Sequence, residues 1–111
     1  MDSVDIVVRK ALPKASIKVY LEGHGLSEPS SPIIPALYRD SYQEVSRGAF
    51  VNGSIDGILL GYKIRRTCQV QLLHASGNFK DSVKKALLKS IKDWSSQLDL
   101  YLQFDESVTT Q

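Results

Sequence analysis

The sequence predicts an α+β fold, in which a mainly antiparallel sheet of about five strands is covered on one face by one long amphipathic helix. Three observations predict it. Several short segments alternate apolar and polar residues, as half-buried strands do. Asn52-Gly53 joins two such segments, which is a strong hairpin signal. Apolar residues recur at helical spacing from Val83 to Leu98, and the segment after Pro35 allows a second, short helix.

Composition places the chain among ordinary folded proteins. Its 111 residues are 42% hydrophobic and 23% charged, so we expect one domain over residues 1–111 with a single core. The single cysteine, Cys68, cannot close an intramolecular disulfide. The acidic start of the chain is unlike a signal peptide, and no apolar run is long enough to span a membrane. We therefore expect a cytoplasmic protein, with the nucleus as the alternative, and no transmembrane segment.

The first third of the chain predicts two strands and a loop. Residues 4–11 contain three consecutive β-branched residues, which favours a strand at the edge of the sheet. A turn with a proline follows over residues 12–15, because proline cannot donate to a strand ladder. From 16 to 22 apolar and polar residues alternate, which predicts a second, half-buried strand. Residues 23–35 are rich in proline and serine and predict a loop.

The next segment is ambiguous between helix and strand. A short helix over residues 36–47 would begin after Pro35 and stop at Gly48. A strand from Tyr42 onward is the alternative. The sequence alone leaves both open.

A hairpin follows, with strands over residues 49–51 and 55–64. Gly57 and Gly61 lie inside its second strand and predict a bulge or a close approach of another backbone. After a turn at Arg65-Arg66, residues 67–74 predict another strand, whose apolar side carries Cys68, Val70 and Leu72.

The helix predicted over residues 81–97 is the best defined element. Asn78 or Asp81 can cap its start by accepting a backbone N–H bond, and Asp81 also complements the helix dipole. Its apolar stripe would face the core, and the alternation over residues 100–105 then predicts a strand that returns to the sheet. Residues 106–111 predict a short frayed tail. The stripe consists of Val83, Leu87, Ile91, Trp94 and Leu98.

Charge is distributed unevenly, although the net charge is only +2. Residues 63–92 hold eight basic side chains and one acid, whereas residues 93–111 hold four acids and no base. Such a basic segment can attract phosphates of nucleic acid or anionic lipid, although folding can also bring the two blocks together and cancel them. A lysine-rich helix face that serves only solubility is the alternative. The anion-binding candidates are Lys63, Arg65, Arg66, Lys85, Lys89 and Lys92.

Candidates for catalysis are few. Cys68 with His24 or His74 is the only thiol and imidazole combination, and Cys68 falls on the apolar side of its strand, where an inert thiol is usual. Two histidines without partner cysteines make a poor metal set, and no phosphate-binding glycine motif occurs. We therefore expect no catalytic residue, no metal site and no cofactor.

These observations favour a non-enzymatic interaction or accessory protein, whose partner is another protein or a second copy of itself. The alternative is an electrostatic binder of nucleic acid or anionic membrane through residues 63–92, for example a small viral matrix-like protein. A strand, a turn with Phe79, a helix with Trp94 and a returning strand together resemble the core of rhabdovirus matrix proteins. Whether Ser31, which precedes a proline, is phosphorylated is left open.

Overall fold

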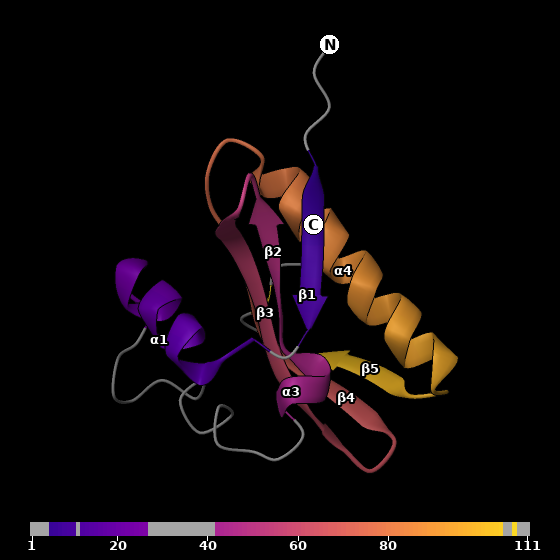
Figure 1. The fold of residues 1–111 in the computed structure, drawn as a ribbon. Helices are drawn as coiled ribbons and strands as arrows, with labels where there is room; N and C mark the ends of the chain where they lie inside the picture. The colour runs from indigo at the N-terminus through magenta and orange to yellow at the C-terminus, as the bar shows by residue number, and fades with distance from the viewer. Residues whose placement is uncertain (1–4, 11, 27–41, 106–107, 109–111) are drawn as a thin grey trace.

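The computed structural model describes residues 5–10, 12–26, 42–105 and 108, and it confirms the α+β fold (Figure 1). One sheet runs in the order β1-β2-β3-β4-β5. The first four strands pair antiparallel, and β5 pairs with β4 in parallel. The strands are β1 (Ile6–Lys10), β2 (Arg47–Val51), β3 (Ser54–Ile64), β4 (Thr67–Ala75) and β5 (Tyr101–Phe104), and the helices are α1 (Lys14–Gly23), α3 (Tyr42–Val45) and α4 (Lys80–Gln97).

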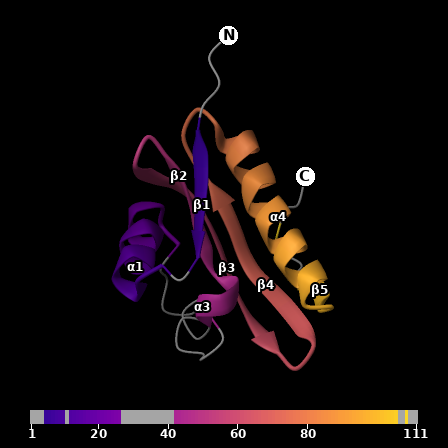
Figure 2. The same ribbon diagram turned by 45° about the vertical axis from the view of Figure 1, so that its right-hand side comes forward.

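Helices lie on both faces of this sheet. Figure 2 shows α4 on one side of the strands and α1 on the other. The α4 side holds one apolar cluster, in which Val83, Leu87 and Ile91 are fully buried. The α1 side holds a smaller cluster built around Ile17 and Leu21. The predicted helical cover on one face is therefore confirmed, and α1 adds a second layer. In the described part of the chain, no helix is both long and apolar enough to cross a membrane.

The strand predicted over residues 16–22 is wrong, because this segment is helix α1. Ile17 and Leu21 are four residues apart, a spacing that places them on one side of either a strand or a helix. Two neighbours decide between these structures. Tyr20 is only 6% exposed and Val19 is 70% exposed, which is the reverse of the predicted alternation. Positions 17, 20 and 21 form one face of a helix, and that face is buried.

The short helix predicted before the hairpin is present as α3, and strand β2 follows it directly. Gly48 does not end the helix as predicted, because it lies inside β2 opposite Ile58. A side chain at position 48 would meet the Leu12 methyl groups, so this glycine serves strand packing. The predictions that concern Pro35, Ser31 and most of residues 23–35 fall outside the described residues.

The Asn-Gly hairpin is confirmed. Asn52 and Gly53 both have positive φ, at 53° and 84°, as the two central residues of a type I′ turn require. Both strand glycines lie beside bulges. Ala49 pairs with Gly57 while Phe50 pairs with Ile55, so Asp56 is an extra residue on β3.

The second bulge lies on β4. Leu60 pairs with Leu72 and Gly61 with Val70, so Gln71 is an extra residue with no counterpart on β3. A bulge shifts the alternation of side chains by one position. For this reason Leu72 packs in the α1 cluster, whereas the sequence placed it on the same side as Cys68 and Val70. The predicted common face of these three residues is therefore wrong at its last member.

The long helix is confirmed as α4, but neither predicted N-cap is used. Phe79 occupies the N-cap position, and no side chain caps the helix there. Asp81 lies in the first turn, as predicted. Leu98, the last member of the predicted stripe, lies beyond the helix end and is 49% exposed. Asp99 adopts a φ of 55° and turns the chain into β5.

Candidate functional site at the opening beside β4

The sheet opens on one side of β4. Strand β5 pairs with β4 only from Thr67 to Val70, and the N–H of Asp105 donates to the carbonyl oxygen of Val70 over 2.9 Å. Beyond this point the described residues of β4 pair with β3 alone. In open α/β sheets, ligands bind in the crevice outside the carboxyl ends of parallel strands, and β4 and β5 are the parallel pair of this sheet. The edge of β4 over residues 71–75 is therefore the candidate site.

Two glutamines lie at the point where the strands separate. Gln69 donates a hydrogen bond from Nε2 to the Asp105 carboxylate, and so holds the end of β5 against β4. Gln71 occupies the bulge, and its Oε1 is buried without a hydrogen-bond partner. Buried polar atoms are nearly always paired, because an unpaired one costs about 1–3 kcal/mol. The Gln71 amide oxygen is thus a hydrogen-bond acceptor that the described structure leaves without a partner.

Helix α4 begins directly after the carboxyl end of β4. Residues 76–79 connect them, and Gly77 has a φ of 80° and lies against the Asp56 carboxylate. Because no side chain caps α4 at Phe79, the first backbone N–H groups of the helix can bind an anion. Lys80 and Lys84 lie in the first two turns. Asp81 lies there too, and its negative charge opposes an anion.

An aromatic and histidine cluster lies on the α1 side of the same strand end. The Tyr20 hydroxyl of α1 and Nδ1 of His74 on β4 are 2.8 Å apart. The ring of His24, at the end of α1, lies 4.2 Å from the Tyr20 ring and 5.0 Å from the His74 ring between centroids. Burial, followed by positive charge on His24 and Lys84, lowers the pKa of His74. The sequence named both histidines but did not bring them together.

The six anion-binding candidates lie away from this opening or along the outer surface of α4. Lys63 pairs with Glu44 over 3.7 Å. Arg66 pairs with Asp99 over 3.2 Å, and Lys89 pairs with Asp93 over 2.7 Å. The last two ion pairs join the basic segment, residues 63–92, to the acidic segment, residues 93–111, which was the alternative that the sequence left open. Arg65 lies in the β3–β4 turn with a φ of 55°, and Lys85 and Lys92 are exposed on α4. Their role in anion binding stays a prediction.

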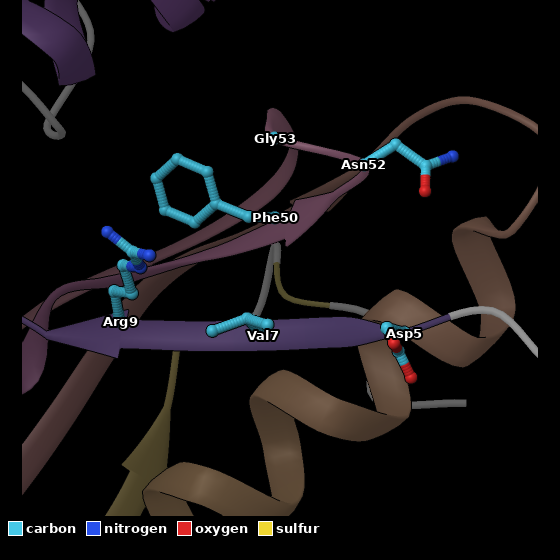
Figure 3. A pocket seen from close by; sticks show the side chains of 6 residues that line it. All are labelled: Asp5, Val7, Arg9, Phe50, Asn52 and Gly53. Carbon is cyan, nitrogen blue, oxygen red and sulfur yellow. The ribbon is translucent and has the colours of Figure 1, made fainter.

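Other parts of the described structure offer fewer groups for catalysis or for metal binding. Cys68 is fully buried, and burial raises the pKa of its thiol to about 11, which disfavours a nucleophilic thiolate. No group of three His, Cys, Asp or Glu residues suited to a metal ion occurs among the described residues. A hollow on β1 and β2 lies apart from β4. Figure 3 shows the Arg9 side chain beside the Phe50 ring, with Asp5 at the far end of β1.

Comparison with solved structures relates this arrangement to known proteins. No protein-family model and no curated protein matches the sequence. Ard1 from Thermoplasma volcanium has a similar structure, with a TM-score of 0.65 and 21% identity, over 86% of this chain and 66% of its own length. The aminoglycoside N-acetyltransferase AAC(6')-Iy, solved in complex with CoA, has a TM-score of 0.64 and 13% identity over 96% of this chain and 80% of its own. An acetyltransferase of the GNAT family from Streptococcus pneumoniae gives 0.63 and 17% over 90% and 74%.

The chain has the fold of these acetyltransferases. This finding overturns the prediction of a non-enzymatic accessory protein or electrostatic binder, because the similar structures are enzymes. It also overturns the viral matrix-like interpretation. That resemblance depended on the order of a strand, a helix and a returning strand, an order that many α+β folds share. The sequence could not show the parallel pairing of β4 with β5, which is the feature that defines the site.

Proposed function

We propose that this chain is a CoA-dependent N-acetyltransferase that binds acetyl-CoA in the opening beside β4. The separation of β4 from β5 at the Gln71 bulge, with α4 beginning at the carboxyl end of β4, is the observation that carries the proposal. Similar structures support it, since AAC(6')-Iy was solved with CoA and with a bisubstrate analogue that contains CoA. Another is a ribosomal-protein-alanine N-acetyltransferase.

The residues of the opening fit CoA. Its long arm carries amide groups, and the free edge of β4 can pair with such groups as it would with a strand. Gln71 offers an unused acceptor to an amide N–H. The uncapped start of α4, with Lys80 and Lys84, suits the diphosphate. The negative charge of Asp81 repels the diphosphate, so the affinity for CoA is lower than the helix start alone would give.

Acetyl-CoA supplies an acyl group on a thioester. The chain has to hold the thioester at the bulge and keep the acceptor amine beside it, because positioning alone lowers the barrier substantially. As the amine nitrogen bonds to the acyl carbon, the bond from that carbon to sulfur breaks. The amine loses one proton and the thiol sulfur gains one, so the reaction consumes no net proton.

Binding is tested by titrating acetyl-CoA into the protein in a calorimeter. We expect Lys84→Ala to weaken binding about 5-fold, because it removes a cation near the diphosphate. Asp81→Asn should strengthen binding about 3-fold by removing a repulsive charge. Lys89→Ala, further along α4 and paired with Asp93, is the control and should leave the affinity unchanged. Equal effects of the two lysine variants would show that binding is not at the start of α4.

Transfer is tested by following release of free CoA thiol in the presence of acetyl-CoA and an amine. Two probes are suggested by the similar proteins: the aminoglycoside sisomicin and a peptide that begins with alanine. We expect thiol release that depends on the amine with at least one of them or with a related primary amine. A protein that does not bind acetyl-CoA at all would contradict the proposed function.

A further inference from the structure

Two imidazole rings meet at the carboxyl end of β4, and a lysine of α4 acts on one of them electrostatically. His24 comes from the end of α1, His74 from β4 and Lys84 from α4. The two imidazole rings are 5.0 Å apart between centroids. Lys84 is near enough for its positive charge to lower the pKa of His74.

Tyr20 orients this cluster. Its hydroxyl is hydrogen-bonded to Nδ1 of His74 at 2.8 Å, which leaves Nε2 of the same ring for a ligand. Its ring also packs against His24, with centroids 4.2 Å apart. Burial first, and then the Asp56 carboxylate, raise the pKa of the Tyr20 phenol, while a hydrogen bond with Ser76 lowers it. The phenol is therefore neutral at physiological pH and keeps its hydrogen.

Positive charge on His24 and on Lys84 acts on His74, and the Asp56 carboxylate acts on Tyr20. Asp81 lies three residues before Lys84 on α4, and its charge offsets part of that of the lysine. Like charges held together are costly, and an anion placed between them removes that cost. An anion also favours the protonated form of an imidazole, so its binding and the proton uptake of His74 support each other.

We propose that His24, His74 and Lys84 form a subsite for an oxyanion such as a phosphate group, and that this subsite takes up a proton when the anion binds. The oxyanion subsite does not depend on the proposed function. The choice between CoA and the acceptor molecule as the source of its ligand does rest on that function. The phosphate groups of CoA are one source. An anionic group on the acceptor molecule is the other.

The experiment uses sulfate, because its charge stays constant between pH 5.5 and pH 8 and any pH dependence then belongs to the protein. We expect sulfate to bind about 5- to 10-fold more tightly at pH 5.5 than at pH 8. Calorimetry in two buffers of different ionisation enthalpy should show proton uptake on binding near pH 6. The NMR titration of the His74 ring should move to higher pH in sulfate.

Variants separate the three contributions. His74→Gln should reduce the pH dependence and the proton uptake, whereas Lys84→Met should weaken binding at every pH and leave the pH dependence in place. Lys89→Met, on the outer face of α4, is the control for general attraction to lysines and should change nothing. Because His24 is exposed, His24→Gln should fold normally and shift the titration of free His74 to higher pH by removing a positive neighbour.

The source of the anion follows from competition. If CoA displaces sulfate and pantetheine does not, the phosphates of CoA occupy the subsite. If sulfate still binds to the protein saturated with CoA, the subsite binds an anionic group of the acceptor molecule. Failure to bind CoA would end the proposed function and leave the sulfate result standing. Sulfate binding that is absent, or equal in the wild type and in His74→Gln at both pH values, would overturn the subsite.

Discussion

Gly61 on β3 lies against the carbonyl oxygen of Gln69 on β4, so closely that a Cβ at position 61 would collide with that oxygen. The same Cβ would stand only 3.0 Å from a methyl group of Val45. This close approach is opposite the Gln71 bulge. A glycine on β3 is therefore what allows β4 to bend where it parts from β5.

Gly61→Ala should destabilise the fold by about 2–3 kcal/mol, because backbone atoms and a buried methyl have to move. Urea unfolding measures the change. Gly23→Ala is the matched control: no atom lies within 4 Å of the position that its methyl group would take, and alanine favours the helix, so stability should be unchanged or slightly higher. A Gly61→Ala protein as stable as Gly23→Ala would show that the bulge does not depend on this contact.

Arg47 is a buried cation with a defined set of acceptors. It is 0% exposed, and its Nε and Nη2 donate to the carbonyl oxygens of Val45 and Glu44, both over 2.9 Å. Its Nη1 donates to Ser90 Oγ over 2.6 Å, which ties β2 to α4. The guanidinium also lies 5.6 Å from the centroid of the Trp94 ring.

Arg47→Lys should cost about 2–4 kcal/mol of unfolding free energy, because a single ammonium cannot reach all three acceptors. Arg9→Lys is the matched control, since Arg9 also lies over an aromatic ring, 5.3 Å from the Phe50 centroid, but at the exposed edge of the sheet. That change should stay within about 0.5 kcal/mol. Equal costs for the two variants in urea unfolding would contradict a structural role for the fork of Arg47.

Local signals in the sequence are enough to predict much of the fold. The Asn52-Gly53 turn and the helical stripe through Val83, Leu87 and Ile91 are determined by neighbouring residues, and the structure confirms both. The wrong prediction of a strand over residues 16–22 has a physical cause. The spacing of Ile17 and Leu21 fits both the period of a strand and the period of a helix. The burial of Tyr20 and the exposure of Val19 decide for the helix, and both depend on the rest of the fold.

The candidate site depends on contacts that no local pattern contains. In a strand, Tyr20 and His24 would lie far apart, whereas in α1 they are one helical turn from each other and meet His74. The partner of Gly61 could not be known until β3 and β4 were paired. The parallel β4–β5 pairing likewise depends on α4 packing back across the sheet. These are contacts between residues far apart in the sequence, so local periodicity does not determine them.

Cys68 should make stability fall at high pH. Burial raises the pKa of its thiol to about 11, above its ordinary value of 9.0. Between these values the unfolded thiol loses its proton and the folded thiol keeps it. The contribution is therefore complete below pH 9 and is lost as the pH rises toward 11, by roughly 3 kcal/mol in total.

Cys68→Ala tests this dependence through its slope. The variant will be less stable at neutral pH because of the cavity it leaves, but its stability should decline less than that of the wild type from pH 9 to pH 11. Urea unfolding across this range measures both curves. Parallel curves would mean that the thiol titrates normally in the folded protein.

Gln71 and Gln69 lie two residues apart on β4 and differ in their partners, which makes them a matched pair for testing the site. Gln69 donates to the Asp105 carboxylate, whereas Oε1 of Gln71 is buried without a partner. Gln69→Met should therefore lower stability by about 1 kcal/mol. Gln71→Met should leave stability unchanged or raise it by up to about 1 kcal/mol, because it removes an unpaired buried amide oxygen.

The effects on ligand binding should be reversed. If the Gln71 amide accepts a hydrogen bond from the CoA arm, Gln71→Met should weaken acetyl-CoA binding about 5- to 10-fold, while Gln69→Met should weaken it less. Urea unfolding and calorimetric titration on the same preparations measure both quantities. A Gln71→Met protein that loses stability and keeps full affinity would show that the amide serves the fold and not the cofactor. The opposite combination, stability kept and affinity lost, places the cofactor at the bulge.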